Sequence, residues 1–441
     1  MNLQKRLVLG LIFYITFANT DVKVYQLLTG TGTEGIIPWQ HGFYITLGLA
    51  FVLVLFKFNQ KDAVWVRSRA GCLQSPNIAL PLFLWFVAAT FSFFLNMDSE
   101  GIIKAYVGGF VSLLIIYLAL RDIPMTSKFF NQIMMALSLG TVVTLGIGII
   151  VYYRQWGIPN LITLILSRYD LMAMREYRQI TYGNLGNTAC LLVLIGPPFL
   201  AMAVDKSRPL LMRLWFAGCF LLAGANLLIT GARAGFIVMG LAVVLVFFYF
   251  RKLGRLVFLL CLGFIIFQAF FINYSLEGMK LFIEHLANAI MLNSAADYSI
   301  MSRFEAIREG WAVFCEHWLV GVGPESSSQY ISVSTAHQFF IQQGVQLGIL
   351  GMFATVALVV AVFWRLGRVA FRKGQPFCTE RFIFLIGPAM YFLYGVLANL
   401  ALNFGSVNIW ICLMGAFLAL ADFRELRVDS RPPEEPGGMY S

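Results

Sequence analysis

The chain has 441 residues, of which 59% are hydrophobic and 12% are charged, and its formal net charge is +10. A soluble protein carries about 25% charged residues, so the composition excludes an ordinary globular domain. Stretches of about 20 apolar residues recur along the chain, and each is long enough to cross a bilayer as a helix. We therefore predict an all-α polytopic membrane protein.

The apolar stretches predict about 12 transmembrane helices. Nine spans with short loops occupy residues 1–274, together with an arginine-rich outer segment at about 153–187. A large outer loop with amphipathic helices follows at 275–337, and three more spans occupy 338–422. The tail, 423–441, is rich in proline and glycine, and we expect it to be disordered. The predicted spans lie near 7–26, 40–57, 77–96, 101–120, 129–152, 188–205, 212–230, 234–250, 255–274, 338–364, 382–401 and 405–422.

Basic residues give the orientation of the spans, because positively charged loops remain in the cytoplasm. Alternation of the spans places 22 of the 32 lysines and arginines on the side that also holds both termini. We predict that this side is cytoplasmic, so the net charge reflects topology and not nucleic-acid binding. The seven cysteines include no CxxC pair, which argues against a disulfide framework and against a structural zinc site.

Ten basic residues fall on the outer side against this rule, and seven of them are arginines. Arginine is the better bidentate partner for phosphate, so an arginine-rich outer face suggests an anionic ligand. Solvated loop charge and contacts with lipid headgroups are the alternatives. The ten residues are Lys23, Lys104, Lys280, Arg154, Arg168, Arg175, Arg178, Arg233, Arg303 and Arg308.

Arg233 lies in "LLITGARAGFIVMG" (227–240), at a tight outer turn between two predicted spans. Gly231 and Gly235 flank it and allow a close approach of the backbone. Arg233 also begins a helix, and the N-terminal amides of a helix attract anions. One interpretation is a phosphate site, and the other is an arginine that extends to the membrane interface.

Two more arginines lie in "YSIMSRFEAIREGWAVF" (298–314), where apolar residues recur at the spacing of an amphipathic helix. Arg308 is three residues from Glu305, so a local salt bridge would account for it. Arg303 has no acidic residue four positions away on either side. Arg303 is therefore the stronger candidate for binding a ligand, and Arg308 is a secondary one.

His337 directly precedes the predicted span 338–364, in "STAHQFFIQQGVQLGILG". Gln338, Gln342 and Gln346 recur every four residues, so they share one face of the helix. Such a polar stripe faces a cavity or the interior of a bundle, and we expect it to line a cavity with His337 as a general base. A histidine at the membrane interface with a structural hydrogen bond is the alternative. No DxD pair occurs in the sequence, so a metal that bridges a diphosphate is not indicated.

Four segments in order resemble the O-antigen ligase/polymerase family of bacterial envelope enzymes, and together they cover roughly residues 229 to 351. Ala232, Trp318, Gln338 and Gln346 stand where the family usually has serine, proline, asparagine and often glutamate. These departures leave the histidine and both arginines in place. The segments are the arginine turn "ITGARAG" (229–235), the arginine and tryptophan helix "SRFEAIREGW" (302–311), the glycine stretch "HWLVGVGPES" (317–326) and the histidine signature "HQFFIQQGVQLGILG" (337–351).

The chain length, the number of spans and the single large late outer loop most resemble the ligase that completes lipopolysaccharide. The resemblance implies a GT-C-type glycosyltransferase of the bacterial inner membrane, without a cofactor or metal. It would transfer a polysaccharide from undecaprenyl pyrophosphate to lipid A-core at the periplasmic face, with inversion, in contact with membrane lipids.

The resemblance also implies roles for single residues. Arg233 and Arg303 would bind the donor pyrophosphate, and His337 would take the proton from the acceptor hydroxyl. Arg168, Arg175 and Arg178 lie outside the segments that carry the resemblance, and our hypothesis is that they guide the donor. Arg308 and Gln338 are secondary candidates.

Three alternatives remain open on the sequence. An O-antigen polymerase would use the same donor with a second lipid-linked chain as acceptor. A protein O-oligosaccharyltransferase would use a serine or threonine acceptor. A transporter of the lipid-linked sugar belongs to another class, and it would place charged residues at mid-membrane depth, whereas the charges here gather at the outer rim.

Overall fold

The computed structural model of the protein is mostly helical, with 86% of the described residues in helices. This confirms the all-α prediction for the part of the chain that the structure describes. That part consists of residues 3–17, 39–59, 78–97, 102–103, 106–156, 185–230, 232–252, 254, 298–324, 326–332, 336, 338–371, 377–398 and 409–425.

The elements follow the predicted spans closely. A helix occupies every predicted range except 255–274, which lies outside the described residues together with the first part of the large outer loop, 275–297. The elements are α1 (Leu3–Phe17), α3 (Trp39–Asn59), α4 (Ala79–Leu95), the π-helix η2 (Tyr106–Val111), α6 (Ser112–Leu120), β1 (Pro124–Met125), α7 (Ser127–Trp156), α9 (Leu185–Val204), α10 (Leu210–Thr230), α11 (Arg233–Tyr249), α13 (Tyr298–Glu316), the 3-10 helix η5 (Ser326–Gln329), α14 (Phe339–Phe371), α15 (Cys378–Ala398), α16 (Ile409–Ala421) and β2 (Arg424–Glu425).

Four helices in the described part are long and apolar enough to cross a membrane, and six further apolar helices are shorter. The chain is therefore a helical membrane protein, and the count of 12 spans stays a prediction. The four long stretches are Ser127–Ile147, Leu210–Leu227, Phe339–Phe371 and Cys378–Leu397.

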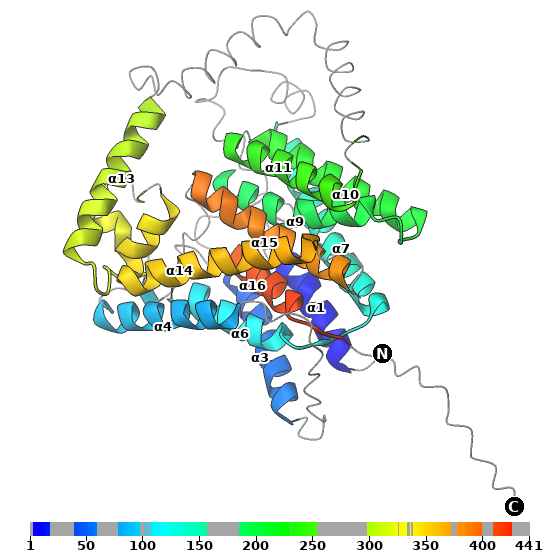
Figure 1. Ribbon diagram of the computed structural model, residues 1–441, viewed down its shortest axis with the longest axis horizontal. Helices are drawn as coiled ribbons and strands as arrows, with labels where there is room; N and C mark the ends of the chain where they lie inside the picture. The colour runs from blue at the N-terminus through cyan, green and yellow to red at the C-terminus, as the bar shows by residue number, and fades with distance from the viewer. Residues whose placement is uncertain are drawn as a thin grey trace, which may run out of the picture.

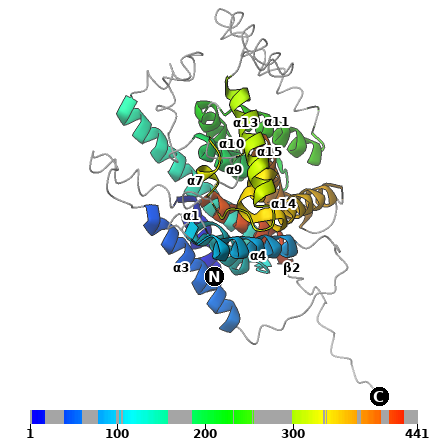
Figure 2. The ribbon, with the colours of Figure 1, turned by 90° about the vertical axis from the view of Figure 1, so that its left-hand side faces the viewer.

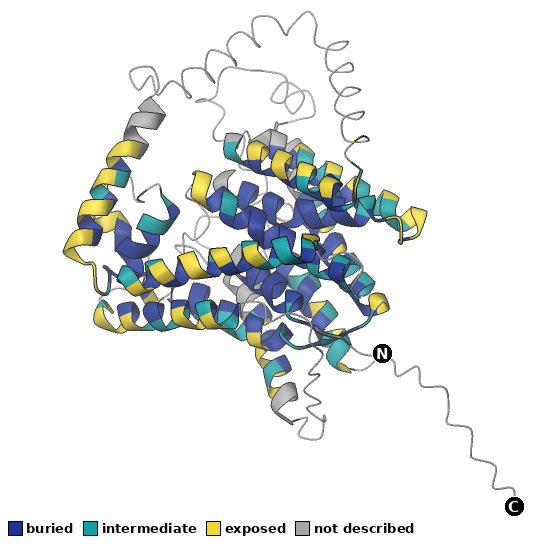
Figure 3. Ribbon diagram, viewed as in Figure 1, coloured by how far each residue is buried: buried dark blue, intermediate teal, exposed yellow. Residues whose placement is uncertain are grey.

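The helices form a bundle in which α4, α14, α15, α9 and α10 lie side by side in this order, while α13 crosses one end of it (Figure 1). Figure 2 shows α13 in front of α14 and α15 when that end faces the viewer. Buried residues are concentrated in the middle of the bundle, in α9, α15 and α16 (Figure 3). Large apolar side chains such as Phe91, Leu211 and Phe353 are exposed on its sides, as expected for surfaces that contact lipid.

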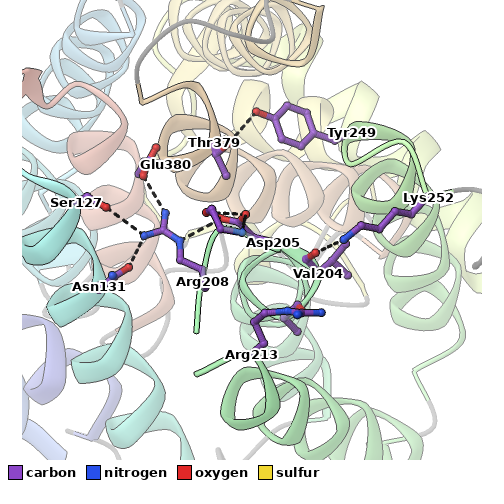
Figure 4. A network of polar contacts seen from close by, with 12 residues as sticks. Ser127, Asn131, Val204, Asp205, Arg208, Arg213, Tyr249, Lys252, Thr379 and Glu380 are labelled. Atoms are coloured by element: carbon purple, nitrogen blue, oxygen red, sulfur yellow. Dashed lines mark hydrogen bonds and ion pairs between the residues drawn. The ribbon is translucent and has the colours of Figure 1, made fainter. Parts of the chain in front are cut away.

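A buried arginine in the turn between α9 and α10 joins these helices to α7 and α15, at the end of the bundle that is predicted to be cytoplasmic (Figure 4). Arg208 bonds to the carboxylates of Asp205, at 3.0 Å, and Glu380, at 2.8 Å, and its side chain is 5% exposed. Its remaining nitrogen donates to Asn131 and Ser127 of α7. A buried charge is tolerated where it is paired and hydrogen-bonded in this way. The network fixes the end of α9 and the starts of α7, α10 and α15 relative to one another.

A second contact holds the C-terminal end of α16 at the same end of the bundle as the arginine network. Asp422 accepts hydrogen bonds from Arg365 of α14 and from the Tyr117 hydroxyl of α6. The two-residue strand β2 then pairs with β1 in parallel.

The position of the arginine network also identifies which helix ends lie at the opposite end of the bundle. The end of α14 is joined to the start of α15 by residues 372–376, so it lies at the same end as Glu380. The starts of α14 and α11 and the end of α10 therefore lie at the other end, where α13 crosses.

Candidate functional site

The turn that follows α13 joins α14 at a break in the latter helix. Gly348 has φ 68° and ψ −168°, which interrupts the helical hydrogen bonding. The polar groups released by this break bond to residues 318–323 instead, so a buried kink leaves few of them unpaired. The three backbone bonds run from Ile349 N to Trp318 O (2.7 Å), from Val322 N to Val345 O (2.8 Å) and from Gly323 N to Gln346 O (3.1 Å).

Two glycines make this close approach possible. A Cβ atom at Gly348 would lie 2.3 Å from the carbonyl oxygen of Leu319, and one at Gly321 would lie 2.5 Å from the carbonyl carbon of Gln346. Both glycines also have positive φ, at 68° and 75°, which other residues adopt at a cost. The glycine stretch (317–326) and the histidine signature (337–351) of the sequence are therefore parts of one folded unit.

The glutamines of α14 face the interior of the bundle. Gln342 is 4% exposed, and Gln343 and Gln346 are completely buried. The expectation that this stripe lines a cavity is wrong for Gln342 and Gln346, because neighbouring segments enclose them. Among the described residues, the side-chain amide of Gln346 and the Nε2 atom of Gln343 have no hydrogen-bond partner.

Helix α4 supplies polar partners to α14 that the sequence interpretation missed. The Trp85 indole donates to Oε1 of Gln343 at 3.0 Å, and the Ser92 hydroxyl donates to the carbonyl oxygen of Gln346 at 2.6 Å. The Asn96 amide donates to the carbonyl oxygen of Gly321 at 3.3 Å. Trp85, Ser92 and Asn96 are spaced by seven and four residues, so they share one face of α4. This spacing within an apolar span is the signal that could have revealed them.

The backbone on both sides of His337 is fixed by glutamines. Ala336 donates its N–H to Oε1 of Gln342 at 2.7 Å. Gln338 precedes the first helical residue of α14, and its Oε1 accepts from Ile341 N at 2.6 Å, so it caps the helix. His337 itself lies outside the described residues. Its two neighbours in the chain are therefore attached to α14.

Helix α13 packs against the residue that precedes His337. A Cβ atom at Gly310 would lie 2.5 Å from the Cβ atom of Ala336, and Ala306, one turn earlier, is completely buried. Position 303 is three residues before Ala306 and seven before Gly310, so helical periodicity places it on the same side of α13. The structure describes the backbone of Arg303 within α13 but not its side chain.

Arg308 lies on another side of α13 and is exposed. The predicted salt bridge between Arg308 and Glu305 is not observed. Both residues are described and exposed, and they form no ion pair within 4 Å. An ion pair between exposed side chains stabilises a helix by less than about 1 kcal/mol. Arg308 instead lies near Glu309, whose pKa it helps to lower.

Glu309 attaches the loop before His337 to α13. Its Oε2 accepts from the backbone N–H of Ser332 at 2.9 Å and from the Ser332 hydroxyl at 2.8 Å. The backbone bond is the largest cause of a lowered pKa for Glu309, followed by the hydroxyl bond, against a small opposing effect of burial. The loop is thus fixed to α13 by Glu309 and to α14 by Gln342.

Helix α11 begins at Arg233, as predicted, directly after Ala232. Alanine has no side chain that could cap the first amides of this helix, and uncapped N-terminal amides attract anions. The side chain of Arg233 lies outside what the structure describes, as do all of Arg168, Arg175 and Arg178. The structure therefore shows the helix positions of Arg233 and Arg303 at one end of the bundle but not a contact between the two side chains.

Comparison with protein families gives one match in this region. Residues 218–356 match a family model described as O-antigen ligase. The chain matches no curated protein. The matched region begins in α10 and ends in α14, so it contains the start of α11, all of α13, the glycine stretch (317–326) and the break at Gly348. Residues 218–356 are therefore similar to the O-antigen ligase/polymerase family.

Proposed function

We propose that the protein is an O-antigen ligase of the bacterial inner membrane with a GT-C-type fold. It transfers a polysaccharide from undecaprenyl pyrophosphate to a sugar hydroxyl of lipid A-core at the periplasmic face, and both termini lie in the cytoplasm. One observation carries this proposal. The region that matches the family contains the three segments bearing Arg233, Arg303 and His337, and these segments start or cross at the same end of the bundle.

In the proposed reaction, Arg233 and Arg303 bind the donor pyrophosphate. Arginine is suited to this role because its planar group binds two phosphate oxygens at once. The amides at the start of α11 add a partial positive charge beside Arg233. Removal of one such charge partner for the leaving group costs on the order of several kcal/mol of transition-state stabilisation.

His337 acts as the general base. It takes the proton of the acceptor hydroxyl while the oxygen attacks the anomeric carbon of the donor sugar. A new glycosidic C–O bond forms, the bond from the anomeric carbon to the pyrophosphate oxygen breaks, and undecaprenyl pyrophosphate leaves. This single displacement inverts the anomeric centre. Loss of a general base lowers the rate by about 10²–10⁴-fold.

The other candidates have supporting roles in this proposal. Arg168, Arg175 and Arg178 guide the anionic donor to the site. Arg308 is exposed on the outer side of α13 and contributes to the field around the donor. Gln338 contributes by capping α14 next to the base. The reaction proceeds without a metal, because the arginines neutralise the diphosphate.

A complementation experiment tests the proposal. A Gram-negative strain that lacks its own ligase, and that makes matching core and O-antigen, expresses wild type, His337→Ala, Arg233→Ala or Arg303→Ala at equal membrane levels. Wild type should restore O-antigen on lipid A-core in a lipopolysaccharide gel, and the three variants should not. His317→Ala is the matched control, because His317 is an exposed histidine in the turn after α13, and it should retain activity.

The same experiment distinguishes the alternatives. A wild-type protein that only lengthens lipid-linked chains is a polymerase, and one that glycosylates proteins is an O-oligosaccharyltransferase. Net movement of the lipid-linked sugar without a product indicates a transporter. Equal ladders from wild type and His337→Ala would refute the assignment of the base.

A further inference from the structure

The side chain of Gln342 connects two parts of the loop that precedes α14. Its Oε1 accepts from the N–H of Ala336 at 2.7 Å, and its Nε2 donates to the Ser327 hydroxyl at 2.8 Å. The side chain is buried, so water does not replace either bond. A primary amide has one acceptor oxygen and one donor nitrogen, and here each of them contacts a different part of the loop before α14.

This amide restricts the position of residue 337. Ala336 is completely buried, with Gly310 of α13 directly against it. Gln338 caps α14 on the other side. The two chain neighbours of His337 are therefore each held by a glutamine side chain. Of the two bonds at Gln342, the one to the Ala336 N–H acts on the residue that precedes the histidine.

We propose that Gln342 is a positioning residue that places His337 for proton transfer, without touching either substrate. The inference rests on the proposed role of His337 as the general base. A displacement of about 1 Å in such a group lowers the rate by about 100-fold. The effect of Gln342 should therefore appear in kcat, while KM for the donor stays nearly constant.

The neighbouring Gln343 provides a matched control. It is also a buried glutamine of α14, but its Oε1 accepts from Trp85 of α4 and it makes no bond to Ala336. Replacement of either glutamine by methionine keeps the side-chain volume and removes the polar contacts. Any difference between Gln342→Met and Gln343→Met therefore reports the contact with the segment before His337.

The experiment measures transfer from a lipid-linked donor to lipid A-core by the full-length protein, purified and reconstituted. We expect Gln342→Met to lower kcat by about 10–100-fold with little change in KM, and Gln343→Met to stay within about threefold of wild type. Gln342→Glu should recover part of the loss as the pH falls, relative to wild type at the same pH. A protonated carboxyl group both accepts and donates, so it can reproduce both bonds.

A double-mutant cycle provides a readout that a purely structural role would not give. If Gln342 acts through His337, Gln342→Met should not lower the residual activity of His337→Ala any further. A further loss in that background would overturn the inference, as would wild-type kcat in a folded Gln342→Met protein. If Gln342→Met does not fold, two other variants test the inference. Ser327→Ala leaves the bond to Ala336 intact and should retain most of the activity. Gln342→Glu should recover part of its lost activity as the pH falls. A fully active His337→Ala protein would instead refute the proposed role of His337 as the base, and a wild-type protein without transfer to lipid A-core would refute the proposed function.

Discussion

The backbone break in α14 makes a strong prediction about Gly348. In Gly348→Ala, the new methyl group would lie 2.3 Å from the Leu319 carbonyl oxygen and 2.6 Å from the Val320 nitrogen. Both atoms belong to the backbone, so neither can rotate away. The residue also has φ 68° and ψ −168°, a region in which a side chain costs about 1–3 kcal/mol.

The contact itself adds to this strain. To make room, the turn after α13 must move away from α14, which breaks the three backbone hydrogen bonds between them. Each such bond contributes about 0.5–1.5 kcal/mol net, so their loss and the strain together amount to about 3–7 kcal/mol. Folded proteins are stable by about 5–15 kcal/mol. We therefore expect Gly348→Ala to unfold at a much lower temperature, or not to accumulate.

Reaction of buried thiols with a fluorescent dye during heating in detergent measures this effect, since Cys190 and Cys412 are completely buried. Gly367→Ala is the control on the same helix, because a Cβ atom there has nothing within 4 Å. That change should be neutral or stabilising by about 0.5–1 kcal/mol. If both variants unfold at the same temperature, the argument that Gly348 is required by its backbone geometry is refuted.

Three other contacts give further predictions. Gly310→Ala places a methyl group 2.5 Å from the Cβ atom of Ala336; overpacking costs about 1–3 kcal/mol, and the complementation ladder should weaken because residue 336 must shift. Arg208→Met leaves two buried carboxylates without their partner, so unfolding in an SDS titration should need about 3–5 kcal/mol less. The Glu309 contact with Ser332 should be lost in acid, because the pKa of Glu309 is lowered. Its stabilisation is present above the ordinary pKa of glutamate, about 4.3, and is lost as the pH falls through the lower folded value; hydrogen exchange of the Ser332 amide, corrected for its intrinsic pH dependence, should then rise.

Each of these predictions has a matched control. Gly240→Ala adds a methyl group where nothing lies within 4 Å, and the ladder should be unchanged. Lys206→Met removes an exposed charge from the same turn as Arg208 and should not change the unfolding free energy. In Glu309→Gln, exchange at Ser332 should no longer depend on acid beyond its intrinsic rate. Equal effects in a variant and its control would contradict the reasoning in that case.

Hydropathy was sufficient to locate the apolar helices in the described part of the chain. The range predicted at 188–205 is α9, Leu185–Val204, and the range at 234–250 is α11, Arg233–Tyr249. This succeeds because a span is a local property, set by the length and composition of one stretch of chain. The break at Gly348 could not be predicted in the same way. A glycine within an apolar run is equally compatible with a continuous helix that packs closely against another.

The glutamine stripe shows where sequence reasoning about the site stops. Its spacing predicts correctly that Gln342 and Gln346 share a face of α14, but not which segment covers that face. The partner of Gln343 is Trp85, which is 258 residues away in the sequence. A pattern within one short stretch of sequence cannot indicate a contact between residues so far apart in the chain. The roles of Arg233, Arg303 and His337 stay predictions, which rest on the sequence positions of these residues and on the resemblance of ordered motifs.

The distance in sequence between Trp85 and Gln343 has a consequence for biosynthesis. The predicted span α4 is synthesised long before α14, so Trp85 and Ser92 are present before their partners in α14 exist. Unpaired polar groups in a membrane attract other helices or water. The arrival of α14 displaces these temporary partners and joins the two halves of the chain. Assembly of the site is therefore a late step of insertion. A ribosome that stalls before residue 339 leaves a fragment in which the polar groups of α4 lack their partners in α14.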